Sequence, residues 1–143
     1  MQKVKILLVE DNEGDIVLTR EALEESRIIG HVDVARDGAL AIRYFEEILR
    51  DEYSKLPDMM FLDINLPKKN GHEVLQYVKE SEELRHIPVI MLTTSSSEKD
   101  IVESYRHYAN CYITKPVDVN HFIDVISHIE NYWVNVVQLP HKK

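Results

Sequence analysis

The apolar residues of the chain gather in short runs that are separated by segments of helical period. Four of these runs lie at residues 4–9, 59–62, 89–92 and 111–114. Because little polar alternation interrupts them, they predict strands that are buried on both faces, as in a parallel sheet. Residues 31–36 alternate between apolar and polar side chains and predict one further, weaker strand.

Between these strands, apolar side chains recur every three or four residues, which is typical of amphipathic helices. The stripes are Leu18, Ala22 and Leu23 within residues 13–28; Ala41, Phe45 and Ile48; Val74, Leu75 and Val78; Ile101, Tyr105 and Tyr108; and Phe122, Ile126, Ile129 and Trp133. We expect a loop at residues 50–57 and a third helix that stops before Pro88. Strand-then-helix units in succession predict an α/β domain with a doubly wound parallel sheet of five strands and helices on both faces.

Composition narrows the class of protein. A chain of 143 residues with 44% hydrophobic side chains is expected to form one domain. Its formal charge of -8 argues against a nucleic-acid or anionic-membrane partner, because such surfaces require a basic patch. No apolar run approaches the roughly 20 residues of a membrane span, and the strand expected from Val4 leaves no room for a signal peptide. Together with the single cysteine, Cys111, these features predict a cytoplasmic protein.

Chemically capable side chains follow four of the predicted strands. Glu10 and Asp11 follow the first, Asp63 follows residues 59–62, Thr93 follows residues 89–92, and Lys115 follows residues 111–114. In an open α/β sheet, ligands bind beyond the carboxyl ends of the strands, so we expect these side chains to converge at one edge. Clustered carboxylates repel one another unless a cation lies among them. A hard divalent ion with oxygen ligands, Mg²⁺ above all, fits such a cluster.

This arrangement suggests phosphoryl chemistry. With a metal bound, Asp63 could attack a phosphoryl group as a nucleophile and form an aspartyl phosphate. Lys115 would offset charge on the phosphoryl oxygens, and Thr93 would donate a hydrogen bond to them. Simpler interpretations stay open at this point: Asp11 as the cap of the first helix, Thr93 as the start of a serine-rich loop, and Lys115 as a solvated lysine.

In this order and spacing the residues resemble the receiver domains of two-component response regulators, over about residues 3–131. The motifs are Glu10-Asp11, Asp63-x-Asn65-x-Pro67-x-x-x-Gly71, Thr93 and Lys115-Pro116. The resemblance implies a flavodoxin-like (CheY-like) fold with strand order 2-1-3-4-5. It also implies that Asp63 accepts a phosphoryl group from a sensor histidine kinase. Such a protein is not a conventional enzyme, but it catalyses its own phosphorylation from phosphohistidine and its slow autodephosphorylation.

The same resemblance implies a metal site and a switch. Asp11, Asp63 and the backbone carbonyl of Asn65 would hold Mg²⁺ or Mn²⁺. Glu10 stands where many receivers have Asp and is one methylene longer, so it would act through a water or from outside the direct ligands. Thr93 and Tyr112 would form the switch: on phosphorylation the hydroxyl moves toward the phosphoryl group and the aromatic ring turns inward, which remodels the surface of the fourth and fifth strands and helices.

The C-terminal part resembles, more narrowly, the response regulators that partner cyanobacterial phytochromes. This implies a stand-alone receiver whose kinase is a phytochrome-type light sensor. We expect a receiver domain at residues 1–131 and an apolar extension at residues 132–143. Such an apolar patch is typical of an interface, and the expected homodimer seam comprises Tyr105, Tyr108, Phe122, Trp133, Val136 and Leu139. The alternative is that the extension folds back on its own domain.

Two other function classes compete with the receiver. A phosphatase of the haloacid dehalogenase type also uses an Asp nucleophile and Mg²⁺, but it requires a second Asp where this chain has Asn65. A phosphorylation-independent interaction module would keep the fold without needing Asp63, Asp11, Thr93 and Lys115 together. The receiver accounts for all of these residues at once.

Overall fold

The structure is a computed structural model that describes residues 3–25, 29–51, 55–64, 66–93 and 111–114. Of residues 29, 93 and 111–114 it describes the backbone alone. The helices predicted after the fourth and fifth strands lie outside the described residues.

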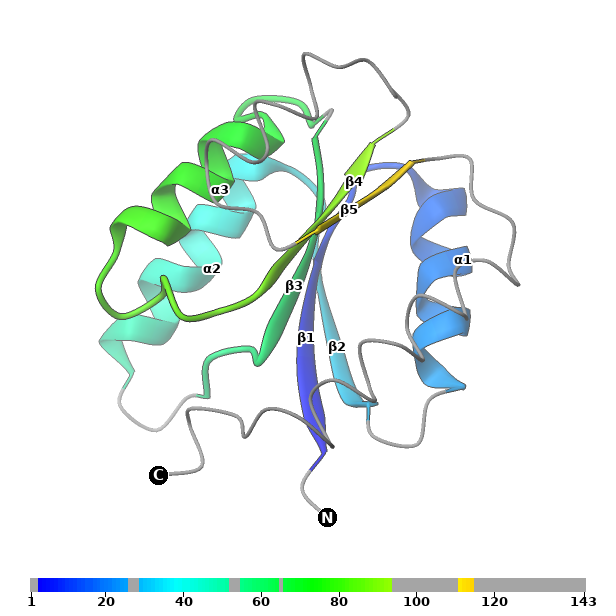
Figure 1. Cartoon of the computed structure of the whole chain (residues 1–143), viewed down its shortest axis with the longest axis horizontal. Helices are drawn as coiled ribbons and strands as arrows, with labels where there is room; N and C mark the ends of the chain where they lie inside the picture. Colours follow the sequence, from blue (N-terminus) through cyan, green and yellow to red (C-terminus); the bar gives the residue numbers. More distant parts are fainter. Residues whose placement is uncertain (1–2, 26–28, 52–54, 65, 94–110, 115–143) are drawn as a thin grey trace.

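A parallel sheet forms the middle layer of the molecule. Its strands are β1 (Val4–Val9), β2 (Ile29–Ala35), β3 (Met59–Asp63), β4 (Val89–Thr93) and β5 (Cys111–Thr114). They pair in the order β2-β1-β3-β4-β5, and each pairing is parallel (Figure 1). The N-terminal strand therefore lies inside the sheet, with a neighbour on each side.

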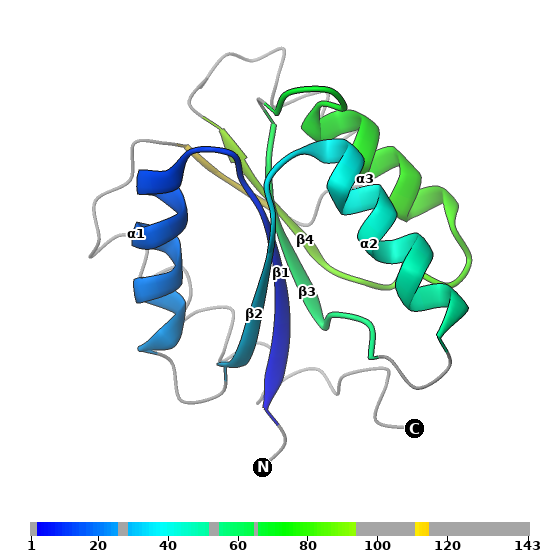
Figure 2. The ribbon, with the colours of Figure 1, turned by 180° about the vertical axis from the view of Figure 1, so that it is seen from behind.

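Helices cover both faces of this sheet. Helix α1 (Glu13–Glu24) lies on one face, whereas α2 (Gly38–Arg50) and α3 (Gly71–Glu80) lie on the other (Figures 1 and 2). Side chains of β1 alternate between two buried clusters: Leu7 and Val9 pack on the α2 and α3 side, and Ile6 and Leu8 pack on the α1 side. Because strand residues point to opposite faces in turn, an apolar strand supplies both cores at once. For the described residues, the predicted class of a parallel sheet with helices on both faces is confirmed.

Several element boundaries differ from the predicted ones. Helix α1 ends at Glu24 rather than at residue 28, and β2 runs from Ile29 to Ala35 rather than over residues 31–36. The last buried side chain of α1 is Leu23, and the extended backbone of β2 begins at Ile29.

The third helix ends at Glu80, before Pro88 as predicted. Buried Leu84 and Ile87 lie in the turn that follows it and continue the core without a helix. The ammonium of Lys79 donates to the backbone carbonyls of Arg85 at 3.0 Å and Ile87 at 2.6 Å, which fastens this turn to α3.

Candidate functional site

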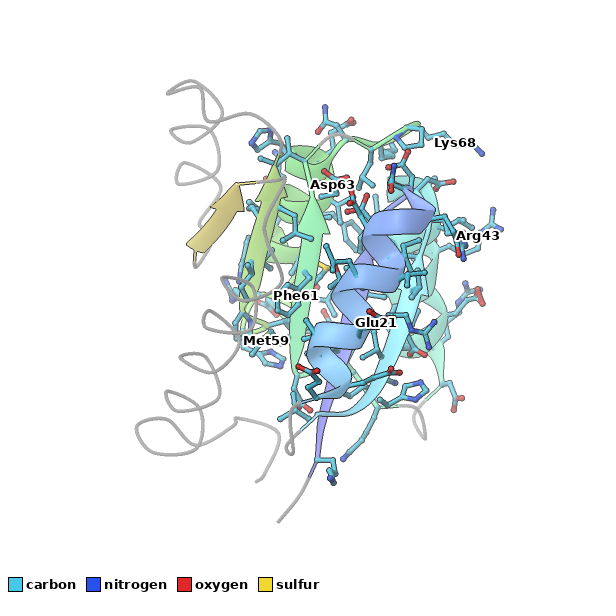
Figure 3. The ribbon with its side chains drawn as sticks, turned by 90° about the vertical axis from the view of Figure 1, so that its right-hand side faces the viewer. Glu21, Arg43, Met59, Phe61, Asp63 and Lys68 are labelled. Atoms are coloured by element: carbon cyan, nitrogen blue, oxygen red, sulfur yellow. The ribbon has the colours of Figure 1, made fainter. Side chains whose placement is uncertain are left out.

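Three carboxylates meet at the carboxyl edge of the sheet. Val9 of β1 pairs with Leu62 of β3, so the next residues of the two strands, Glu10 and Asp63, lie side by side. Carboxylate oxygens of Glu10, Asp11 and Asp63 all lie within 4.8 Å of one another. Figure 3 shows Asp63 at the end of β3, beyond Phe61 and Met59. The convergence predicted for these three side chains is thus observed.

Burial distinguishes the members of this carboxylate cluster. Glu10 is 0% exposed and Asp63 is 3% exposed, whereas Asp11 is exposed. The backbone N–H of Glu10 donates to the Ala35 carbonyl at 3.0 Å, and its Oε2 accepts from the Asn12 N–H at 3.2 Å. The Glu10 side chain is therefore turned back toward its own loop.

The cap of α1 is Asn12, not Asp11. The Asn12 side chain accepts from the Asp15 N–H at 2.9 Å, and Asn12 has the extended backbone of an N-cap residue. The simpler interpretation of Asp11 as a helix cap is therefore wrong, and its carboxylate belongs with the cluster.

The turn after β3 is packed tightly against the strand end. The Ile64 N–H donates to the Leu92 carbonyl at 2.9 Å, and the Gly71 N–H donates to the Ile64 carbonyl at 2.8 Å. A Cβ on Gly71 would lie 2.4 Å from the Asp63 carbonyl oxygen, so this close approach requires glycine. Asn70 then starts α3 with a capping box to Glu73. These contacts hold the backbone at Asp63 and in the turn that follows it in one position.

The donor set fits a hard divalent cation. Two nearly buried carboxylates and a third beside them repel one another, and a bound cation would offset this repulsion. Oxygen-only ligands at the end of a strand, with one exposed member open to water, are what Mg²⁺ prefers, and Mn²⁺ accepts the same ligands. Among the residues that the structure describes, this is the one group of acidic, histidine or cysteine side chains with metal-ligand spacing.

The other predicted site residues are described only in part. Thr93 is the last residue of β4, directly after Leu92, which pairs with Asp63, and Tyr112 of β5 pairs with Met91. Tyr112 thus lies in the strand predicted at residues 111–114, whereas Thr93 is the last residue of β4 rather than the first residue after it. The side chains of both are outside the described part. Outside it entirely are Asn65, Lys115, Tyr105, Tyr108, Phe122, Trp133, Val136 and Leu139.

Sequence reasoning did not select the charged residues of the loop between β2 and α2. Arg36 donates to the Glu13 carboxylate of α1, and Asp37 lies 3.8 Å from the ammonium of Lys68 in the turn after β3. Asp37 precedes the apolar stripe of α2, which is an N-cap signal, and the structure shows it capping that helix. Nothing in the local sequence marks Lys68 as the partner.

A second polar cluster lies on the α2 side of the sheet. Asp33 of β2 accepts from the Tyr44 hydroxyl at 2.8 Å, is bonded to the His31 ring at 2.6 Å, and lies 3.7 Å from the Lys5 ammonium. Burial opposes ionisation of Asp33, but these partners outweigh it and hold the pKa of the carboxyl below its usual range. Burial and the same hydrogen bond raise the pKa of Tyr44 far above that of a free tyrosine. None of these side chains belongs to the carboxylate cluster.

In the described part of the chain, no helix combines the length and the apolar character that crossing a bilayer requires.

Comparison with known proteins identifies the relatives of this arrangement. The family model described as the response regulator receiver domain matches residues 6–127. The response regulator Rcp1 of Synechocystis sp. is 40% identical over 135 residues, which cover 94% of this chain and 92% of that protein.

Solved structures agree with this result. The phosphorylated cyanobacterial phytochrome response regulator RcpA superposes with a TM-score of 0.83 at 42% identity, over 96% of this chain and 99% of that one. The Mn²⁺-bound form of Rcp1 superposes with a TM-score of 0.80 at 40% identity, over 96% of this chain and 99% of that one.

Proposed function

This chain belongs to the family of response regulator receiver domains, and from that premise we propose that it accepts a phosphoryl group on Asp63 from a sensor histidine kinase. The observation that carries the proposal is the carboxylate cluster. Asp63 is nearly buried at the end of β3, and oxygens of Asp63, Glu10 and Asp11 lie within 4.8 Å of one another.

The proposed transfer is a displacement at phosphorus. A carboxylate oxygen of Asp63 forms the new P–O bond while the P–N bond of the kinase phosphohistidine breaks. The bonding electron pair leaves with the imidazole nitrogen, so no further reactant is needed. The product is a mixed anhydride on Asp63, which water later hydrolyses in the slow autodephosphorylation.

Charge compensation falls to the groups around Asp63. Asp11, Asp63 and the backbone carbonyl of Asn65 would hold Mg²⁺ or Mn²⁺, and the bound ion supplies positive charge for the phosphoryl oxygens. The hydrogen bond from Asn12 to Glu10 supports an indirect role for Glu10, since one of its oxygens is already engaged. Lys115 and Thr93 would contact the phosphoryl group from the ends of β5 and β4.

We further propose that phosphorylation switches the surface around β4 and β5 through Thr93 and Tyr112. The pairing of β4 with β5 supports this proposal, because it places the backbones of the two residues on neighbouring strands. The full doubly wound architecture, with helices after both strands, is part of the same proposal. The surface that changes would then be formed by β4, β5 and the helices that follow them.

A phytochrome-type light sensor is the proposed kinase. The support is the similarity to RcpA, a phytochrome response regulator, over nearly the whole of both chains. Because histidine kinases draw their phosphoryl group from ATP, the reaction would take place in the cytoplasm. The test compares the rate of phosphotransfer from a purified phytochrome kinase with the rate from an unrelated histidine kinase. A faster rate from the phytochrome kinase would support this pairing, and equal rates would contradict it.

The division into a receiver at residues 1–131 and an apolar extension at residues 132–143 also remains a proposal, together with the homodimer. Light scattering over a concentration series would compare the full chain with a chain truncated after Asn131. A dimer that dissociates on truncation is expected. A monomer in both cases would contradict the proposed seam.

The decisive test of the phosphoryl acceptor is intact mass after incubation with Mg²⁺ and acetyl phosphate. We expect the wild type to gain one phosphoryl group, and Asp63→Asn to gain none. Arg43→Gln, at an exposed position of α2, serves as a variant that should still be phosphorylated. Equal labelling of the wild type and Asp63→Asn, or none in the wild type while Mg²⁺ binds, would overturn the proposal.

A further inference from the structure

The loop between β2 and α2, residues 36–37, contributes no side chain to the carboxylate cluster, but it contacts both loops that flank the cluster. We propose that this β2–α2 loop positions the metal site, with Arg36 and Asp37 as positioning residues. The inference rests on the proposed function, because it concerns how the same site is held in shape.

One arm of the loop reaches the segment that carries Asp11. Arg36 donates to the carboxylate of Glu13, the first residue of α1. This hydrogen bond and the opposite charge hold the pKa of the Glu13 carboxyl below its usual range and raise that of the Arg36 guanidinium. Just before Arg36, the Ala35 carbonyl accepts the N–H of Glu10. The two contacts thus involve residues that flank Asp11 in the sequence, Glu10 and Glu13.

The other arm reaches the turn after β3. Asp37 caps α2 by accepting the Leu40 N–H at 2.7 Å, and its second oxygen lies 3.8 Å from the ammonium of Lys68. Lys68 has φ 66, a left-handed backbone that a residue with a side chain rarely adopts. Surrounding contacts must therefore favour this conformation.

Backbone packing continues the second arm. A Cβ on Gly38 would lie 1.9 Å from the Lys69 carbonyl oxygen, so the start of α2 lies directly against the turn after β3. This is the turn that contains Asn65, the proposed carbonyl ligand. Arg36 therefore contacts the segment that carries Asp11, and the adjacent Asp37, of opposite charge, contacts the turn after β3.

These ion pairs act on position more than on stability. The Lys68 side chain is 71% exposed, and exposed pairs contribute little to the free energy of unfolding. A metal site, in contrast, needs its oxygens held to within roughly 0.5 Å of the favoured geometry. Loosening either loop should weaken Mg²⁺ binding while leaving the fold nearly as stable.

The direction of the change in Mg²⁺ affinity distinguishes a positioning role of these residues from a purely electrostatic one. Arg36→Gln and Lys68→Gln each remove a positive charge near the site, which by Coulomb's law alone would tighten Mg²⁺ binding. Positioning predicts the opposite: about 3- to 10-fold weaker binding, toward the low end of what partners of metal ligands contribute. Arg43→Gln, which removes the same charge from an exposed position of α2 (Figure 3), is the matched control and should leave the affinity unchanged.

The experiment is calorimetric titration of the full chain with Mg²⁺, with urea denaturation of each variant beside it. Arg36→Glu should weaken Mg²⁺ binding further, and adding Glu13→Arg should restore it by re-forming the pair in reverse. Unchanged or tighter binding in Arg36→Gln and Lys68→Gln, or no rescue in the swap, would overturn the inference. If the wild type bound Mg²⁺ but gained no phosphoryl group, the proposed function would fail and this inference would still stand. A wild type that binds no Mg²⁺ would overturn both.

Discussion

Replacing Gly71 by alanine tests the idea that the turn after β3 is pressed against the end of that strand. The added Cβ would lie 2.4 Å from the Asp63 carbonyl oxygen and 2.5 Å from the Ile64 Cα. Comfortable contacts lie near 3.5 Å, so the backbone must yield by about 1 Å. Overpacking of this kind costs about 1–3 kcal/mol.

Other contributions nearly cancel. Loss of the hydrogen bond from the Gly71 N–H to the Ile64 carbonyl adds about 1 kcal/mol. The better helix propensity of alanine offsets up to about 1 kcal/mol. We therefore expect Gly71→Ala to lower the free energy of unfolding by about 1–3 kcal/mol and to slow labelling by acetyl phosphate, because Asp63 shifts with its carbonyl.

Urea denaturation measures the loss in stability, and intact mass over time measures the labelling. Gly14→Ala is the matched control, since its added Cβ would meet only the Asn12 side-chain oxygen, at 3.3 Å. Its stability should change by less than about 1 kcal/mol, and its labelling should not change. If Gly71→Ala were as stable as this control and were labelled at the wild-type rate, the turn would not be pressed against the strand.

Three further predictions concern residues away from the site. Because hydrogen bonds from Tyr44 and His31 outweigh burial and keep the pKa of Asp33 low, its ionised form stabilises the fold above about pH 4, and this contribution is lost as the pH falls through the lowered pKa. In urea denaturation at a series of pH values, the free energy of unfolding of Asp33→Asn should fall less steeply toward acid pH than that of the wild type. An equally steep fall in both proteins would contradict this account. Lys79→Met should destabilise the fold by about 1 kcal/mol in thermal unfolding, because two backbone carbonyls lose their donor. A more stable variant would mean that desolvation, which lowers the Lys79 pKa, outweighs both hydrogen bonds. Phe45→Ala should cost about 3–5 kcal/mol in urea denaturation, since the ring is 0% exposed in the α2 and α3 core, and a loss below about 1 kcal/mol would contradict tight packing there.

Much of the sheet could be predicted because buried parallel strands leave a plain signal. The apolar run at residues 59–62 has no polar alternation, and the structure places it at the centre of the sheet as β3. The end of α1 was harder to predict, because charged residues of high helix propensity continue past Leu23 with no breaker. The backbone must be extended by Ile29, where it pairs with Val4 of β1, and that pairing is a tertiary fact.

The same division applies to the site. Glu10, Asp11 and Asp63 could be brought together from sequence because the carboxyl ends of parallel strands share one edge. The choice between Asp11 and Asn12 as the helix cap could not be made, since both are good caps and they are adjacent. The pairing of Asp37 with Lys68 depends on the packing of α2 beneath the turn after β3, and no spacing rule encodes it.

The interior position of β1 has a consequence for synthesis of the chain on the ribosome. Val4–Val9 is made before its neighbour β3, which ends at Asp63, so 54 more residues must be made before both edges of β1 can be paired. At typical elongation rates of 5–20 residues per second this takes roughly 3 to 11 s. Throughout that interval the nascent chain contains an apolar segment with at least one open hydrogen-bonding edge, which makes the segment a natural ligand for chaperones that bind emerging polypeptides.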